Sequence, residues 1–269
     1  MSHSAAFFDL DRTLISGASA FPIGVEAWRQ GLASNKDISN WAKAAVGFLV
    51  LGDRGGASDD TRTAFLSRIE GTSSDAMDNL ATGVLPKLVA RVRPESKKLL
   101  KMHRDAGRDT WIVSASPTVI VEPLARALNM EGGLGTSGKV VDGHYTGELD
   151  GPFMYGRGKA EAIEKLASER GYDMERCYAY SDSVSDLPMM ELVGHPVAVN
   201  PDGPLDEVAH ERGWPVVIFA RKTKRAVAMS SVGAATAGIA TGAYLLGRKH
   251  GRSVTLVKVA KRNVFGERR

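Results

Sequence analysis

The sequence predicts an α/β protein with a doubly wound parallel-sheet core, an inserted helical cap and a C-terminal basic and apolar helical tail. After residue 93, short apolar runs alternate with helical patterns, which is typical of a parallel sheet covered by helices on both faces. Residues 20–92 show helical periodicity without a clear strand. After residue 219 the composition turns basic around an uncharged segment. These observations separate three parts of the chain.

The helical block interrupts the core after its first strand, which is expected at residues 5–9. Within the block, Ser73 or Ser74 is a candidate N-cap for a long helix. One apolar stripe there recurs at helical spacing and comprises Ile38, Trp41, Ala45, Phe48 and Leu49. The resulting division is a core at 1–15 and 93–219, a cap at 16–92 and a tail at 220–269.

The second half of the core is expected to alternate helices with strands. Pro94 begins a helix that reaches about residue 108, and a strand follows at 110–116. We expect the next helix to start at Ser116-Pro117, with the serine as cap and the proline at the first helical position. The remaining elements are a hairpin at 139–149 that turns at Asp142-Gly143, helices from about Gly158 and from Asp186, and strands at 177–181, 196–200 and 215–219.

Polar residues gather where the predicted strands end. In an open α/β sheet, ligands bind beyond the carboxyl ends of the strands. A phosphoryl group and a carboxylate nucleophile are both negative, so they approach only with a cation between them. Carboxylate oxygens suit Mg²⁺, a lysine adds a mobile positive charge, and hydroxyl groups with helix N-terminal amides can hold phosphoryl oxygens. The candidate residues are Asp9, Asp11, Ser114, Lys159, Ser181, Asp182 and Asp186.

Four motifs in order resemble those of the haloacid dehalogenase (HAD) superfamily of phosphatases. They are DLDRT at 9–13, VSAS at 113–116, the lysine of GRGK at 156–159 and SDSVSD at 181–186. The helical insertion resembles the cap of the IB branch, to which phosphoserine phosphatases belong. The resemblance covers roughly residues 5–219. It implies a Rossmann-like core and a phosphatase of the phosphoserine phosphatase-like group.

The resemblance also implies roles by position. Asp9 would be the nucleophile that forms an aspartyl-phosphate, and Asp11 would protonate the leaving alkoxide and then deprotonate the hydrolytic water. Thr13 and Ser114 would hold the phosphoryl group. Lys159 would neutralise both Asp9 and the phosphate.

The same resemblance implies a Mg²⁺ ion held by the Asp9 carboxylate, the Asp11 backbone carbonyl and Asp182. Asp186 would orient Lys159 or a metal-bound water. Each residue alone has a plainer interpretation, since Asp186 before Leu-Pro could simply be an N-cap. The joint order of the motifs favours the enzyme. Cys177 falls inside a strand pattern and is expected in the core, and His103 shows no metal spacing.

The substrate is less closely specified than the chemistry. At the interval where phosphoserine phosphatases carry a glutamate that holds the substrate amine, this chain has Ala18. The second motif usually continues with two glycines, and here it reads Ser114-Ala115-Ser116-Pro117; Ser185 stands where asparagine is usual. The segment at 181–202 resembles IB hydrolases of which some relatives are fused to acyltransferases, which implies a small or lipid-related phosphomonoester. The alternatives are phosphoserine phosphatase proper, a phosphotransferase, or a membrane-tethered non-catalytic regulator.

The tail differs from the body in charge. Twelve of the 35 Lys and Arg residues but one of the 31 acids lie after residue 219, so the tail carries +11 and the rest −7. The acidic body argues against a nucleic-acid-binding body. The basic tail instead suits an anionic surface, either a membrane or a nucleic acid. Residues 226–246 are uncharged and would span about 30 Å as a helix. They are a candidate membrane helix; the alternatives are a small-residue helix packed on protein, or a flexible tail.

The expected location follows from the single cysteine and the first residues. Cys177 cannot form an intramolecular disulfide, and MSHSAA lacks the basic and apolar regions of a signal peptide. We therefore expect a cytoplasmic catalytic part that the C-terminal segment anchors to a membrane.

Overall fold

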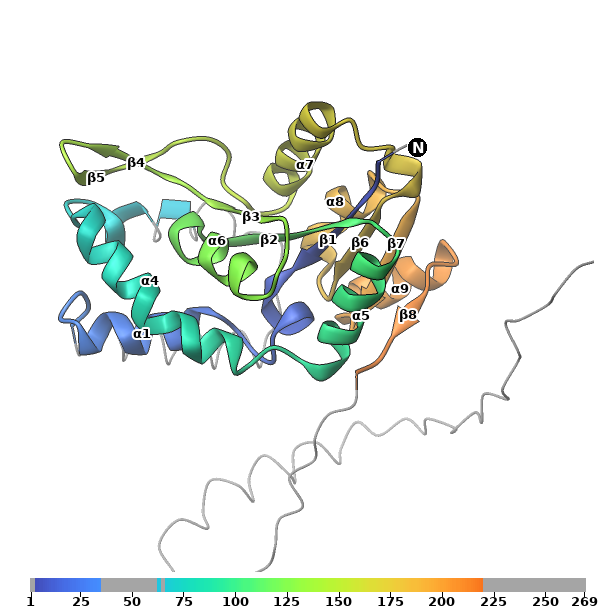
Figure 1. Ribbon diagram of the computed structural model, residues 1–269, viewed down its shortest axis with the longest axis horizontal. Helices are drawn as coiled ribbons and strands as arrows, with labels where there is room; N and C mark the ends of the chain where they lie inside the picture. The colour runs from blue at the N-terminus through green and yellow to red at the C-terminus, as the bar shows by residue number, and fades with distance from the viewer. Residues whose placement is uncertain (1–2, 35–61, 64–65, 220–269) are drawn as a thin grey trace, which may run out of the picture. The chain divides into compact units, whose positions relative to one another are not determined.

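The computed structural model describes residues 3–34, 62–63 and 66–219 (Figure 1). Its centre is a six-stranded sheet in the order β3-β2-β1-β6-β7-β8, in which every neighbouring pair is parallel. The predicted doubly wound α/β fold is therefore confirmed. The strands are β1 (Ala5–Asp9), β2 (Asp109–Pro117), β3 (Gly132–Thr136), β6 (Tyr178–Ser181), β7 (His195–Val199) and β8 (Val216–Val217).

Alternate side chains of the strands enter two separate cores, one on each face of the sheet. In β1, Phe8 packs in the core that also contains α4, α5 and α6, whereas Phe7 packs in the core with α7, α8 and α9. Phe7 and Phe8 are 0% and 1% exposed, and burying such a side chain contributes about 1.5–3 kcal/mol. The helices are α4 (Ser74–Val89), α5 (Pro94–Asp105), α6 (Thr118–Ala127), α7 (Arg157–Arg170), α8 (Leu187–Glu191) and α9 (Gly203–Glu211).

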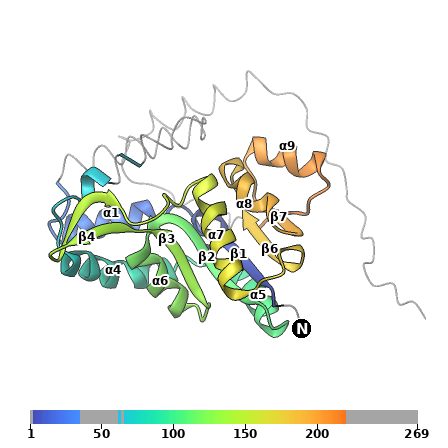
Figure 2. The same ribbon diagram turned by 90° about the horizontal axis from the view of Figure 1, so that it is seen from above.

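The inserted segment and a hairpin lie together at one end of the described unit. Figures 1 and 2 show α1 (Ala20–Arg29), α4 and the hairpin of β4 (Gly138–Val141) and β5 (His144–Leu149) there, away from α9. The hairpin turns at the predicted Asp142-Gly143, where φ is +49° and +76°. The Ser73 hydroxyl caps α4 by accepting from Ala76 N at 3.2 Å. The division into core and cap stays a prediction.

The structure differs from the sequence analysis at three elements: one helix start was wrong, and one strand and one helix were not predicted. The helix predicted from Ser116-Pro117 begins at Thr118 instead, because β2 continues through Pro117, which pairs with Thr136. The strand β3 was not predicted, since GGLGT lacks β-branched and aromatic residues until its last position. Its glycines serve close packing: a Cβ on Gly135 would lie 2.7 Å from Thr118 Cα. Helix α9, capped by Asp202, was also not predicted.

The predicted tail at 220–269 lies beyond the described residues, and the chain divides near the start of this tail, between Ala220 and Arg221. The candidate membrane helix at 226–246, like the apolar stripe at 38–49, lies outside the described residues. Within the described part of the chain, every helix is too short or too polar to traverse a bilayer.

Candidate active site

The predicted acids lie at one edge of the sheet. Strand β1 pairs in parallel with β2 on one side and with β6 on the other, so the carboxyl ends of all three point the same way. Asp9 ends β1, Asp182 follows β6, and Ser114 lies near the end of β2. All three side chains are buried, at 7%, 4% and 3% exposure. Sequence reasoning from strand ends thus placed them at one edge, as the topology has it.

Lys159 joins two of these carboxylates. Its Nζ donates to Asp9 Oδ1 at 2.6 Å and to Asp186 Oδ2 at 2.8 Å. Asp186 Oδ2 also accepts from Ser181 Oγ at 2.6 Å. Burial lowers the pKa of Lys159, but the Asp186 and Asp9 carboxylates outweigh this, so the net pKa is raised and the amine stays charged. Asp186 occupies the N-cap position of α8, but its carboxylate makes no capping bond there and bonds Lys159 and Ser181 instead.

The Asp9 carboxyl sits in a strongly unfavourable environment for an anion. Burial is the main reason that its pKa lies well above the usual value, and Asp186, Asp182 and Asp11 raise it further. Lys159 is the opposing influence. An additional positive charge beside this buried carboxyl would favour its ionised form.

Asp11 lies in the irregular turn Leu10–Leu14, where Arg12 has φ +61°. Its carboxylate accepts from Ser19 on both oxygens, at Oδ1 from the backbone N (2.7 Å) and at Oδ2 from Oγ (3.0 Å). Burial raises the pKa of Asp11, and the two bonds from Ser19 partly oppose this. Thr13 is 2% exposed, and its Oγ1 has no hydrogen-bond partner among the described residues. That orphaned hydroxyl is available to a ligand.

Asp182 pairs with Arg12, whose Nε lies 2.9 Å from Oδ2. Burial raises the pKa of Asp182 to about 7; Arg12 opposes the rise, and Asp186 and Asp202 add to it. The loop after β6 is fixed by Asp202, whose N donates to Asp182 O at 2.7 Å. The Asp202 carboxylate accepts from Val184 N at 3.1 Å and caps α9 by accepting from Leu205 N at 2.8 Å.

Three further residues at this edge were missed by sequence reasoning as contributors: Arg12, Ser19 and Ser116. Arg12 and Ser116 were inside quoted motifs, so their positions at the ends of β1 and β2 were the available signal. Ser19 gave no such signal, because it stands ten residues after Asp9 and reaches Asp11 only through the fold.

The donor set fits a Mg²⁺ ion. The described residues contain no group of three or more His, Cys, Asp or Glu side chains arranged to hold a metal. Mg²⁺ does not require one, because it keeps several waters and uses one or two carboxylates. Asp9 and Asp182 supply two carboxylates, and their raised pKa values show that the protein alone leaves their negative charge under-compensated.

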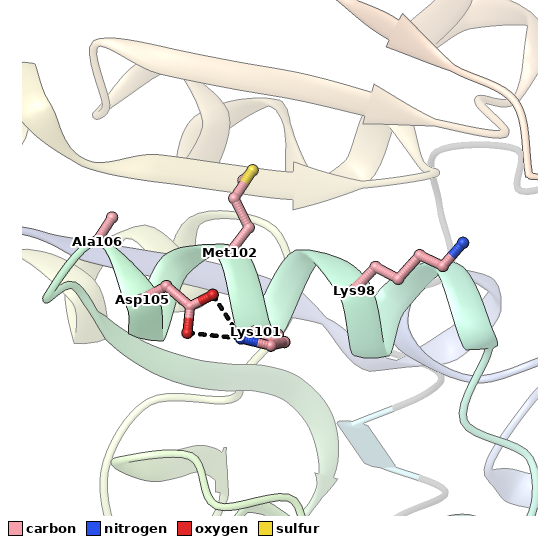
Figure 3. A pocket seen from close by; sticks show the side chains of 5 residues that line it. All are labelled: Lys98, Lys101, Met102, Asp105 and Ala106. Atoms are coloured by element: carbon pink, nitrogen blue, oxygen red, sulfur yellow. Dashed lines mark hydrogen bonds and ion pairs between the residues drawn. The ribbon is translucent and has the colours of Figure 1, made fainter.

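The described residues form a hollow on α5 and a smaller cavity beside the end of β2. The larger, of about 420 Å³, lies on the outer side of α5 and contains none of the predicted site residues (Figure 3). It is lined by Lys98, Lys101, Met102, Asp105 and Ala106. Lys101 pairs with Asp105, one turn further along the same helix, at 2.6 Å. A smaller cavity of about 70 Å³ is lined in part by Pro117, the residue that follows Ser116. Its lining residues are Ile69, Met77, Pro117, Thr118, Val119, Thr136, Ser137, Gly138 and Tyr145.

Comparison with known proteins identifies relatives of the whole described unit. Residues 6–191 match the family of haloacid dehalogenase-like hydrolases. The chain is 40% identical to a probable phosphatase of Mycobacterium tuberculosis over 82% of this chain and 77% of the other. It is 37% identical to a phosphoserine phosphatase of the same organism, over 88% and 80% respectively. A solved protein of unknown function from Bordetella pertussis shares the fold, with TM-score 0.69 and 24% identity over 81% of this chain and 99% of the other.

Proposed function

The chain belongs to the haloacid dehalogenase-like hydrolase family and is a phosphatase of its phosphoserine phosphatase-like group, and from this premise we propose a Mg²⁺-dependent phosphomonoesterase with an aspartyl-phosphate intermediate. The observation that carries the proposal is Lys159, buried between Asp9 and Asp186 at the carboxyl edge of the sheet. A fixed cation beside a buried carboxylate is what nucleophilic attack on a phosphate ester needs.

Asp9 is the proposed nucleophile. Lys159 holds its Oδ1 at 2.6 Å, so among the contacts of the described residues Oδ2 remains for attack on phosphorus. The ammonium also balances the charge of the phosphoryl group as it arrives. Thr13 Oγ1 and Ser114 Oγ would donate to the phosphoryl oxygens, since the first is without a partner and the second accepts a 3.2 Å bond from Ser116 N. A bound Mg²⁺, held by Asp9, Asp182 and the Asp11 carbonyl, would supply electrostatic stabilisation of the developing charge.

Asp11 is the proposed acid and base. Burial raises its pKa, which favours a protonated form that can donate to the leaving oxygen. After the ester oxygen leaves, the Asp11 carboxylate accepts a proton from the water that attacks the aspartyl-phosphate. Asp186 would keep Lys159 in place through both steps, because it bonds the same ammonium.

For the substrate, we propose a small phosphomonoester whose leaving group carries no ammonium. Ala18 stands at the interval where phosphoserine phosphatases place a glutamate. Among the described residues, no acidic side chain lines the 70 Å³ cavity beside Ser116; Thr118 and Ser137 there pair at 2.8 Å. A glycerol-type or lipid-related ester fits such apolar and hydroxyl surroundings. Phosphoserine is the second candidate, because one relative at 37% identity is a phosphoserine phosphatase.

The decisive test replaces Asp9. We expect the purified chain to hydrolyse p-nitrophenyl phosphate with Mg²⁺, and Asp9→Asn to lower kcat at least about 10³-fold. Acid quenching should trap a phosphoprotein in the parent chain and none in Asp9→Asn. Asp142→Asn, at the exposed hairpin turn, is the matched control and should keep full activity. Unchanged turnover in Asp9→Asn would remove Asp9 from the mechanism.

A substrate panel separates the remaining alternatives. Glycerol phosphate, lysophosphatidate and phosphoserine should be compared by kcat/KM. A preference for phosphoserine would establish the second candidate, and phosphate transfer to an added alcohol in place of water would indicate a phosphotransferase. Absence of any turnover, with Asp9 intact, would favour a non-catalytic regulator.

We also propose that the tail anchors a cytoplasmic catalytic part to a membrane. The support is the uncharged segment 226–246 between basic clusters and the +11 charge after residue 219. Fractionation of cells that express the chain with and without residues 221–269 tests this. The full chain should sediment with membranes and the shorter chain should not; a full chain found only in the soluble fraction would overturn the proposal.

A further inference from the structure

Two serines at or beside positions that depart from the family pattern are linked by hydrogen bonds to the Asp11 side chain. Ser116 stands where the second motif usually has its second glycine, and Ser19 follows Ala18, which stands at the interval of the missing glutamate. The two serines are far apart in sequence, yet their hydroxyl oxygens lie 2.9 Å apart. Both belong to a chain of bonds that ends at the Asp11 carboxylate.

The direction of these bonds follows from the number of protons available. The Asp11 carboxylate accepts at Oδ2 from Ser19 Oγ at 3.0 Å, which uses the only proton of that hydroxyl. Ser116 Oγ must therefore be the donor in the 2.9 Å bond to Ser19 Oγ. Asp11 Oδ1 is held separately by Ser19 N at 2.7 Å. Because each carboxylate oxygen of Asp11 accepts one of these bonds, each keeps a second lone pair for a substrate.

The structural role expected for Ser19 is not the one it plays. It is the N-cap residue of α1, where a serine hydroxyl ordinarily accepts from the second or third amide of the helix. Here Ser19 makes no side-chain cap bond, has helical φ and ψ of −65° and −31°, and is 1% exposed. Its hydroxyl is directed to Asp11 at the expense of capping.

The second serine connects the acid to the residue proposed to hold phosphate. Ser116 N donates to Ser114 Oγ at 3.2 Å, while Ser116 Oγ contacts Ser19 Oγ at 2.9 Å. A glycine at 116 would supply the amide but not the hydroxyl. Ser116 lies within β2, in the stretch between Val113 and Pro117 where the pairing with β3 shifts register, so its hydroxyl is carried by the strand itself.

We propose that Ser19 and Ser116 are positioning residues that lock the Asp11 carboxyl in the orientation from which it exchanges a proton with the ester oxygen. The inference rests on the proposed phosphatase function. Neither serine is proposed to contact the substrate; Ser19 fixes both oxygens of Asp11, and Ser116 fixes the hydroxyl of Ser19. General acid catalysis contributes about 10²–10⁴-fold, and it depends on hydrogen-bond geometry.

Leaving groups of different basicity separate positioning of the acid from every other effect. An alkyl phosphate needs a proton on its leaving oxygen, whereas p-nitrophenolate departs without one. We expect Ser19→Ala to lower kcat/KM about tenfold to hundredfold for glycerol phosphate and by no more than about threefold for p-nitrophenyl phosphate. kcat/KM is the quantity to use, because it reports the steps through phosphorylation of Asp9.

Four further variants test whether the loss in Ser19→Ala comes from its missing hydroxyl. Ser19→Thr keeps the hydroxyl and should restore most of the alkyl phosphate activity. Ser116→Ala should give a smaller selective loss, and Ser19→Ala with Ser116→Ala should be no worse than Ser19→Ala, because Ser116 acts through Ser19. Ser73→Ala is the control: it removes a serine hydroxyl that does cap a helix, and should lower the melting temperature without changing the ratio of the two substrates.

Each outcome decides the matter. Equal losses on both substrates, or no loss in Ser19→Ala, would overturn the positioning role while leaving the phosphatase intact. Failure of the parent chain to hydrolyse either ester would overturn the proposed function and this inference with it. Should Ser19→Ala melt below the assay temperature, the ratio measured in Ser116→Ala decides.

Discussion

Two buried polar clusters of this protein differ in how well their charges are compensated. The acidic cluster, at the carboxyl ends of the strands, comprises Asp9, Asp11, Lys159, Asp182 and Asp186. The His103 cluster comprises His103, Arg108, Tyr178 and Tyr180; it lies against the opposite part of the strands, since Arg108 directly precedes β2 and Tyr178 begins β6.

In the His103 cluster, each ring nitrogen of the histidine has a partner. Arg108 Nε donates to Nδ1 at 2.8 Å, so the proton lies on Nε2, which donates to Tyr180 Oη at 2.8 Å. Burial, and then Arg108, lower the pKa of His103 to about 4, so the ring is neutral. Phe8 stacks on Tyr180 with 4.6 Å between ring centroids.

In the acidic cluster, four carboxylates share one buried lysine and a half-exposed arginine. The pKa values of Asp9 and Asp182 are raised because burial is not matched by positive charge. The same sheet thus carries one cluster with a neutral histidine whose two ring nitrogens both have partners, and one ionic cluster in which carboxylates outnumber positive charges. The contrast supports the proposed active site at the carboxyl edge of the sheet, where carboxylates outnumber positive charges.

Metal removal should produce the largest difference between the clusters. Chelation with EDTA should lower phosphatase activity more than about 100-fold, and added Mg²⁺ should restore it. Saturating Mg²⁺ should also stabilise the folded chain by about 3 kcal/mol at 100 times its dissociation constant, measured as a rise in melting temperature. Asp182→Asn should lose both responses. An activity that survives exhaustive chelation would contradict the comparison.

Truncation in the other cluster should affect folding and not catalysis. His103→Ala removes a fully buried ring and leaves Tyr180 Oη and Arg108 Nε without their partner. We expect the free energy of unfolding to fall by about 2–4 kcal/mol in urea titrations, with activity per folded molecule within about twofold of the parent. Lys101→Ala, exposed on the same helix, is the control and should change it by less than about 0.5 kcal/mol. A large loss of kcat in His103→Ala would break the division of roles.

The two clusters should also respond to pH in opposite directions. His103 binds a proton near pH 4 when folded and near pH 6.5 when unfolded, so the unfolded state holds more protons between these values. Its contribution of about 2–3 kcal/mol is present above pH 6.5 and is lost as the pH falls toward 4. Asp9 and Asp182, with raised pKa values, favour the folded state at low pH and lose this as the pH rises.

Urea unfolding without metal between pH 4 and 7 measures this difference. The curve of the parent chain minus that of His103→Gln should rise with pH across the interval. A flat difference curve would show that the imidazole titrates alike in both states and would remove His103 as a source of the pH dependence.

A third polar network gives the smallest expected effect. Tyr172 Oη donates to Asp109 Oδ2 at 2.5 Å and accepts from Trp111 Nε1 at 3.0 Å. Tyr172→Phe keeps the ring and should lower the free energy of unfolding by about 1–2 kcal/mol, because both partners lose a bond in a buried place. Activity should be unaffected. A variant as stable as the parent would show that water replaces the hydroxyl.

The sequence was sufficient for those features that depend on local pattern and on the geometry of parallel strands. Asp9 and Asp182 could be placed at one edge because each follows a buried run, and parallel strands end together. Lys159 was a candidate as a lysine at a predicted helix start, and its role came from the resemblance; nothing in GRGKAEAI shows that this helix begins beside Asp9. The roles assigned to these residues remain proposals.

What the sequence did not predict depends on contacts between distant segments. Strand β3 is glycine-rich because Trp111, Val121 and Thr118 crowd its backbone, and that crowding is invisible in the sequence. The helix start at Ser116-Pro117 was wrong because pairing with Thr136 extends β2 past a local capping pattern. The hydroxyl contact of Ser19 with Ser116 joins the start of α1 to the second motif, and no local rule gives it.

Asp202 shows that the proposed metal ligand depends on chain far beyond the four motifs. One side chain caps α9 and holds Val184, and the same residue's amide ties down the carbonyl of Asp182. A fragment that stopped at residue 200 would retain every predicted site residue, yet the turn bearing Asp182 would lose its outer support. The boundary of the smallest active fragment is therefore set by α9, a helix that contributes none of the proposed reacting groups.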